Sequence, residues 1–139
     1  MPDLKPELSA RSKYWISKHR YYELKHYCLQ YPHWKALYSK AQNVLRAHSM
    51  AKIDGKQLYS ESDVEKWAVI MADLSRAMKL VERTCTDADS VIGEHLLVGV
   101  TEGKSYAKLL ALRDIPCGQD MYYDRYRKFF YLLSQRRGI

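Results

Sequence analysis

The sequence contains no run of about 18 apolar residues, the length that carries a helix across a lipid bilayer, so no membrane partner is predicted. Its first thirteen residues, MPDLKPELSARSK, hold no apolar stretch of the kind found in secretory signals. Cysteine is scarce: Cys28, Cys85 and Cys117 lie far apart and form no CxxC pair or Cys/His cluster with zinc spacing. These absences predict reduced thiols, a cytoplasmic location and no bound metal.

Signals for β-structure and for catalysis are lacking as well. No segment alternates apolar and polar residues with a period of two, which argues against strands. The chain has six glycines, and none of them forms a phosphate-binding loop or a nucleophile elbow. His19, His26 and His33 recur every seven residues, but Pro32 separates the last two and no pair of carboxylates lies beside them. We therefore expect an all-α protein that is not an enzyme and needs no cofactor.

Charge is distributed unevenly along the 139 residues, whose formal net charge is +7. Residues 1–59 hold eleven Lys or Arg against four Asp or Glu, residues 60–103 hold four against nine, and residues 104–139 hold eight against three. Two basic ends thus flank an acidic middle. Such ends favour nucleic acid or another anionic surface as a partner, with plain solvation of the lysines as the alternative.

Residues 1–59 are interpreted as a basic, aromatic region that contains a pair of helices. The first ten residues hold two prolines and no periodicity, which predicts an irregular N-terminal stretch. Helical spacing predicts a helix from about Ser17 to Gln30, and Pro32 both ends it and suits the first turn of the next helix. The stretch KYWISKHRYYELKHY interleaves aromatic rings with Lys and Arg. It could stack on bases and neutralise phosphates, anchor a protein partner, or pack on the second helix; we favour packing with some phosphate contact.

A long central helix is expected over residues 60–86, after a break marked by the turn signal at Asp54 and Gly55. Ser62 is expected to open this helix, with Glu65 as its partner in a capping box. Apolar residues then recur at spacings of three and four, as in a heptad seam: Val64, Trp67, Met71, Leu74, Met78, Val81 and Cys85. The seam predicts either a homo-oligomer, formed through the residues from Val64 to Met78, or the spine of a monomeric bundle.

Residues 87–139 predict three further helices in the order of a helix-turn-helix unit. The first, ADSVIGEHLLVGVTEG, is expected to end at Gly103, where a positive φ is useful. The second, KSYAKLLALRD, is expected to be capped by Ser105 and to present Leu109 and Leu110 on its apolar side. Pro116 in the turn IPCG stops this helix from continuing, and QDMYYDRYRKFFYLLSQRR is the third helix.

The last helix has two unlike sides. Tyr122, Tyr126, Phe129 and Leu133 follow helical spacing and are expected to be core. On the opposite side, the first turns are expected to touch base edges, and the Lys and Arg further along to touch phosphates. The residues predicted to contact double-stranded DNA are Gln119, Asp120, Tyr123, Arg127, Lys128, Lys104, Lys108, Arg136 and Arg137, of which Gln119, Asp120, Tyr123 and Arg127 are the predicted base-edge contacts.

The stretch VTEGKSYAKLLALRDIPCGQDMYYDRYRKFF resembles the helix-turn-helix of sigma-factor region four, with its Gly-Xaa-Ser-Tyr start, short helix, Ile-Pro turn and basic third helix. It is also similar to the small phage and prophage regulators of the RinA/ArpU type in Gram-positive bacteria, which carry such a module behind N-terminal helices. The resemblance extends over about residues 90–136. It implies promoter or operator DNA as the partner, control of late-gene transcription as the role, and a bacterial host cell as the location.

Two other functions fit the same sequence. One is a small terminase subunit, a ring-forming DNA-packaging protein that also uses a basic helical module; a ring of many subunits would distinguish it. The other is a helical adaptor whose Tyr and Trp surfaces bind a protein and whose charge is incidental. DNA binding with a steep dependence on salt would exclude the adaptor.

Overall fold

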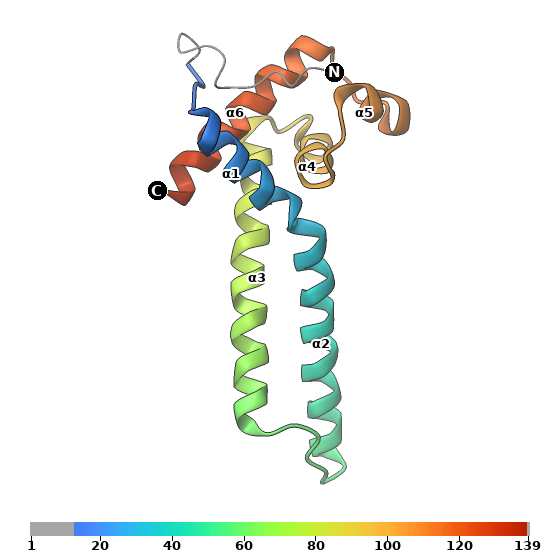
Figure 1. The fold of residues 1–139 in the computed structure, drawn as a ribbon. Helices are drawn as coiled ribbons and strands as arrows, with labels where there is room; N and C mark the ends of the chain where they lie inside the picture. The colour runs from blue at the N-terminus through green and yellow to red at the C-terminus, as the bar shows by residue number, and fades with distance from the viewer. Residues whose placement is uncertain (1–12, 139) are drawn as a thin grey trace. The chain divides into compact units, whose positions relative to one another are not determined.

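The computed structural model describes residues 13–138, and within them every regular element is a helix. The helices are α1 (Lys18–Leu29), α2 (Tyr31–Ile53), α3 (Glu61–Ala88), α4 (Gly93–Glu102), α5 (Tyr106–Arg113) and α6 (Gln119–Arg137) (Figure 1). The expected all-α class is confirmed for this part of the chain. The irregular N-terminal stretch expected over residues 1–10 lies outside the described residues. In the described part, no helix is both long enough and apolar enough to cross a membrane.

Several helix ends follow short-range signals in the sequence. Ser17 caps α1, because its Oγ accepts a hydrogen bond from the Arg20 N–H at 3.2 Å. Ser105 caps α5 in the same way, accepting from the Lys108 N–H at 3.3 Å. Gly103 ends α4 in the left-handed conformation, with a φ of 69°. A glycine adopts this conformation without the steric cost that a Cβ would bring.

The start of α3 differs from the expectation. The helix begins at Glu61, and Ser60 rather than Ser62 is the capping residue: its Oγ accepts from the Asp63 N–H at 3.1 Å and donates to the Asp63 carboxylate at 2.9 Å. The sequence offers two overlapping pairs of a serine and an acid three residues later, and the earlier pair forms the cap. The cap expected at Ser62 is therefore wrong by two residues.

The chain folds as two compact units. The first unit comprises the described residues up to Tyr31 together with those from Leu80 onward, and the second runs from Pro32 to Lys79. These limits differ from the divisions expected near residues 59 and 86. The reason is that α1 packs against α4 and α6, so the first predicted helix belongs with the C-terminal helices and not with α2.

The core of the first unit is built around α6. Tyr122, Phe129, Phe130 and Leu133 are fully buried, and the rings of Phe129 and Phe130 lie edge to face with centroids 4.9 Å apart. Tyr126 is half-buried and shares a hydrogen bond of 2.6 Å with the hydroxyl of Tyr21 in α1. The expected core position of Phe129 is thus confirmed, and burial of one such aromatic ring contributes about 1.5–3 kcal/mol.

The second unit is a helical hairpin, in which α2 and the first part of α3 run antiparallel and are joined by residues 54–60 (Figure 1). In the predicted seam, Leu74 is buried, and Val64, Trp67, Met71 and Met78 are half-buried within a single chain. The Lys40 ammonium in α2 lies 5.5 Å from the centroid of the Trp67 ring. The seam is thus only partly covered within one chain, and assembly of several chains through it stays a prediction.

Candidate nucleic-acid interface

The turn between α5 and α6 has the compact form that the sequence predicts. Asp114 takes the left-handed conformation, with a φ of 50°, and its N–H donates to the Leu110 carbonyl at 3.1 Å. The Cys117 N–H donates to the Ile115 carbonyl at 3.0 Å. The side chain of Ile115 is buried and fills the space between the helices. The turn is therefore held by its backbone and by one apolar plug.

Two tyrosines tie the turn and α6 to the start of α5. The Tyr106 hydroxyl donates to the Cys117 carbonyl at 2.6 Å, which joins the first turn of α5 to the loop. The Tyr106 N–H, one of the donors that a helix start leaves unsatisfied, donates to the Tyr123 hydroxyl at 3.3 Å. The orientation of α6 relative to α5 is thus set by polar contacts as well as by packing. The sequence offered no signal for these contacts, because Tyr106 is separated by 11 residues from Cys117 in the loop and by 17 residues from Tyr123 on α6.

Tyr123 was predicted to contact base edges, and that prediction is wrong. Its side chain is 5% exposed, and together with Lys25, Tyr126 and Phe130 it lines a hollow of about 150 Å³ in the first unit. Its hydroxyl meets the start of α5, where it accepts from the Tyr106 N–H, and α1 packs on a further side of α6. Leu110 differs from its prediction in the opposite sense, because it was expected on the apolar side of α5 and is exposed.

The outward side of α6 holds the remaining predicted contacts. Gln119 and Asp120 in the first turn are exposed, and Asp124, Arg127 and Lys128 are half-buried. Asp120, Asp124 and Lys128 follow one another at intervals of four residues, so they share one face of the helix. At the start of α5, Lys108 is exposed and Lys104 is half-buried. Arg136 and Arg137 at the end of α6 are exposed as well, so eight of the nine predicted residues, all except Tyr123, are at least partly accessible.

Three arginines of α6 have partners inside the first unit. Arg136 donates to the Asp87 carboxylate at 2.6 Å and to the Thr84 hydroxyl at 3.1 Å. The guanidinium of Arg137 lies 3.8 Å from the centroid of the Tyr27 ring. Arg125 donates to Asp89 at 3.0 Å. Arg136 and Arg137, predicted as DNA contacts, are therefore placed where they hold the end of α6 against α3 and α1.

Asp89 is the electrostatic link between the start of α4 and the middle of α6. Its carboxylate accepts from the backbone N–H groups of Val91 at 2.8 Å and Ile92 at 3.1 Å, and from Arg125. Burial alone would raise the pKa of Asp89, but these donors, led by the Ile92 N–H and the Arg125 side chain, lower the pKa below its ordinary value. The charged form is thus the form that the fold stabilises.

Two features near the turn bear on a reactive thiol and on metal binding. Burial, with the negative charge of Asp89, raises the pKa of the Cys117 thiol, which opposes the reactive thiolate that a helix start can favour. Among residues 13–138, no group of three His, Cys, Asp or Glu side chains is placed to hold a metal ion.

Comparisons of the chain with protein-family models, with curated proteins and with solved structures found no match. The candidate interface accordingly rests on the geometry of the first unit and on the pattern of its side chains.

Proposed function

We propose that this chain is a sequence-specific DNA-binding protein that places the N-terminal half of α6 in the major groove of a DNA duplex. The observation that carries the proposal is the contrast between the two sides of α6. One side is fixed on α1, α4 and α5, while the other is outward and begins with the exposed Gln119 and Asp120. A helix that is rigidly held and outward on one polar side suits the reading of base edges.

The side chains on this side suit two kinds of contact. Lys128 on α6, with Lys104 and Lys108 near the start of α5, can neutralise phosphates and release counterions, whereas Arg127 keeps its predicted role at base edges, where an arginine pairs with guanine. Gln119 can pair with adenine and Asp120 can accept from the cytosine amino group. A carboxylate also repels phosphates, so Asp120 and its neighbour Asp124 favour base contacts over indiscriminate binding to the backbone.

The biological role that we propose is control of transcription in a phage or prophage, and it rests on the resemblance of residues 90–136 to sigma-like and RinA/ArpU-type modules. The role needs no catalytic group and no cofactor. The operator sequence follows from the DNA that the chain selects.

The test is a binding measurement with a duplex that the wild-type chain has selected from a randomised pool. Affinity is measured at several salt concentrations for the wild type, for Arg127→Ala/Lys128→Ala, and for the control Lys79→Ala/Arg83→Ala. The control removes the same charges at exposed positions of α3. We expect the α6 variant to bind more weakly and the slope of log K against log salt to fall by about 0.9 per lost phosphate contact, with unchanged melting.

Equal affinity of wild type and α6 variant, both folded, would show that α6 is not the DNA-binding side. A ring of many subunits on the selected DNA would favour the packaging function instead. An absence of DNA binding at every salt concentration would favour the adaptor.

A further inference from the structure

The segment before α1 lies against the C-terminal half of α6, although more than a hundred residues separate the two in sequence. Residues 13–17 are not helical. The ring of Tyr14 lies 5.8 Å from that of Tyr131, centroid to centroid, and Ile16 is buried. Two of the five residues before the helix thus anchor this segment, which we call the lead-in segment (residues 13–18, counting the first residue of α1).

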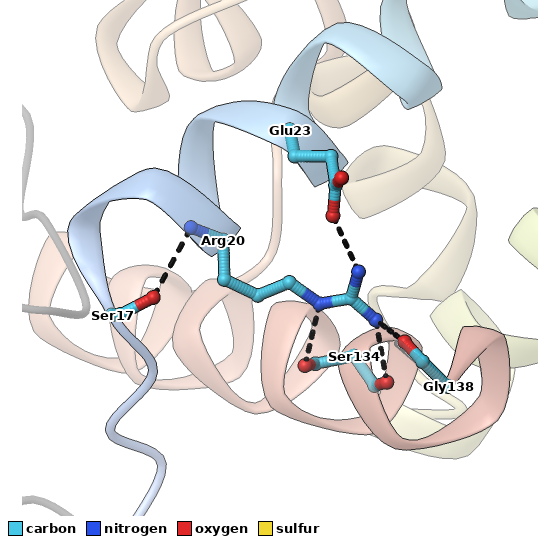
Figure 2. Close-up of polar contacts among 5 residues, drawn as sticks. All are labelled: Ser17, Arg20, Glu23, Ser134 and Gly138. Carbon is cyan, nitrogen blue, oxygen red and sulfur yellow. Dashed lines mark hydrogen bonds and ion pairs between the residues drawn. The ribbon is translucent and has the colours of Figure 1, made fainter.

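The base of the lead-in segment is fixed by one arginine (Figure 2). Arg20 of α1 donates through Nε to the Ser134 hydroxyl at 3.0 Å and through a terminal nitrogen to the Ser134 carbonyl at 2.9 Å. It also contacts the carbonyl of Gly138 and the carboxylate of Glu23. Because Ser17 caps the same turn, the point at which the segment leaves α1 is set relative to α6.

This position brings the segment next to the proposed DNA-contacting side. Tyr131 follows Lys128 by three residues and Arg127 by four, and residues at these intervals are neighbours on a helix surface. Tyr14, by packing on Tyr131, therefore lies one helical turn from the cationic pair of α6. The lead-in segment, from the other end of the sequence, therefore lies beside Arg127 and Lys128 of α6.

The side chains of the segment suit a polyanion. Lys13 and Lys18 are exposed, and the Lys13 ammonium lies 5.0 Å from the centroid of the Tyr14 ring. Trp15 between them is 43% exposed, which is unusual for so large a ring. Ammonium groups neutralise phosphates, and an exposed indole beside them can pack on sugars or unstacked bases.

We infer that the lead-in segment is a second DNA-contacting element, which holds the phosphate backbone beside the groove that α6 enters. The inference rests on the proposed function of α6 and adds a contact that a helix-turn-helix unit alone lacks. Its ligand is the sugar-phosphate backbone of the same duplex, so it adds affinity without adding base sequence preference. An exposed tryptophan is also a common anchor for protein partners. The experiment below distinguishes a protein partner from DNA.

The decisive measurement compares Lys13→Ala/Lys18→Ala with the control Lys66→Ala/Lys79→Ala, in which two exposed lysines of α3 are removed. The probe is the duplex selected by the wild-type chain. We expect the lead-in variant to lower the slope of log K against log salt by about 0.9 per lysine, to weaken binding equally for selected and unselected duplexes, and to melt like the wild type. The control should keep the wild-type slope.

A second readout locates the contact at Trp15. In a background carrying Trp34→Phe and Trp67→Phe, Trp15 is the remaining tryptophan of the three, and we expect its emission to change when the duplex is added. A wild-type slope for the lead-in variant, or an unchanged emission, would overturn the inference and leave the tryptophan as a candidate anchor for a protein partner. If Arg127→Ala/Lys128→Ala still weakens binding in that case, the proposed function of α6 survives without the lead-in segment.

Discussion

At the scale of single residues, position decides what a tyrosine does in this chain. Tyr122 and Tyr123 are neighbours on α6 and both are buried, yet their hydroxyls differ. That of Tyr123 accepts from the Tyr106 N–H, whereas that of Tyr122 has no hydrogen-bond partner among the described residues. Burial raises the pKa of Tyr122 strongly, helped by the neighbouring Tyr123, so the hydroxyl stays neutral. We attribute the position of the Tyr122 hydroxyl to a close approach between α4 and α6.

Gly99 makes that close approach possible, and Gly99→Ala should destabilise the first unit. A Cβ at this position would overlap the Tyr122 hydroxyl oxygen and come within 3.3 Å of Leu109 Cδ1. Overpacking of this kind costs about 1–3 kcal/mol, although alanine is otherwise favoured over glycine inside a helix by about 1 kcal/mol. We therefore expect a lower midpoint in urea, measured by circular dichroism.

The double variant Gly99→Ala/Tyr122→Phe is the control, because it removes the oxygen that the new methyl group meets. We expect it to recover most of the lost stability, and Tyr122→Phe alone to cost little since the hydroxyl has no described partner. If the double variant is as unstable as Gly99→Ala alone, the hydroxyl is not the obstacle and the close approach has another cause.

At the scale of elements, local signals predicted helix ends well and helix sides less well. Ser17, Ser105 and Gly103 act where their chemistry predicts, because a cap involves residues three or four apart in sequence. The buried face of α6 depends on α1, which packs on it from the other end of the chain, and on the contact of Tyr123 with the start of α5. Periodicity reports that a helix has an apolar stripe, but the stripe's width depends on how many helices cover it. The base-edge role predicted for Tyr123 failed for this reason, while Gln119 and Asp120 in the first turn remained exposed.

The junction of α4 with α6 should be sensitive to acid through Asp89. Its side chain is 9% exposed, and its pKa in the folded chain lies below the ordinary value of 3.8. A carboxyl with a lowered pKa contributes stability that is present above the unfolded pKa and is lost as the pH falls through the folded pKa. We expect Asp89→Asn to be less stable than the wild type at pH 7 and the difference to shrink below about pH 4, in urea denaturation at each pH.

The matched control is Asp73→Asn, which changes an exposed carboxyl on α3 and should leave the pH dependence almost unaltered, since exposed ion pairs contribute little. A loss of stability for Asp89→Asn that is equal at neutral and acid pH would contradict the electrostatic account. It would indicate that the asparagine fails to accept the Val91 and Ile92 N–H groups, and that shape rather than charge matters at this junction.

At the scale of the whole molecule, the two units differ in how charge is arranged. The outward side of α6 in the first unit mixes Asp120 and Asp124 with Arg127 and Lys128, a pattern suited to discrimination among bases. In the second unit, α2 carries Lys35, Lys40, Arg46 and Lys52 and no acid, while the first turn of α3 carries Glu61 and Asp63. The net charge of +7 therefore comes from both units.

The seam of α3 decides whether the second unit needs a partner chain, and Leu74→Asp tests it. Leu74 is 9% exposed within a single chain, so a charge there would be buried without any partner, at a cost of several kcal/mol. We expect this variant to unfold at lower urea concentration than the wild type, with both midpoints independent of protein concentration. Val69→Asp, on an exposed side of the same helix, should change little. If the seam instead joined two chains, the wild-type midpoint would rise with protein concentration and the wild type would sediment as an oligomer, because dissociation is coupled to unfolding in such assemblies.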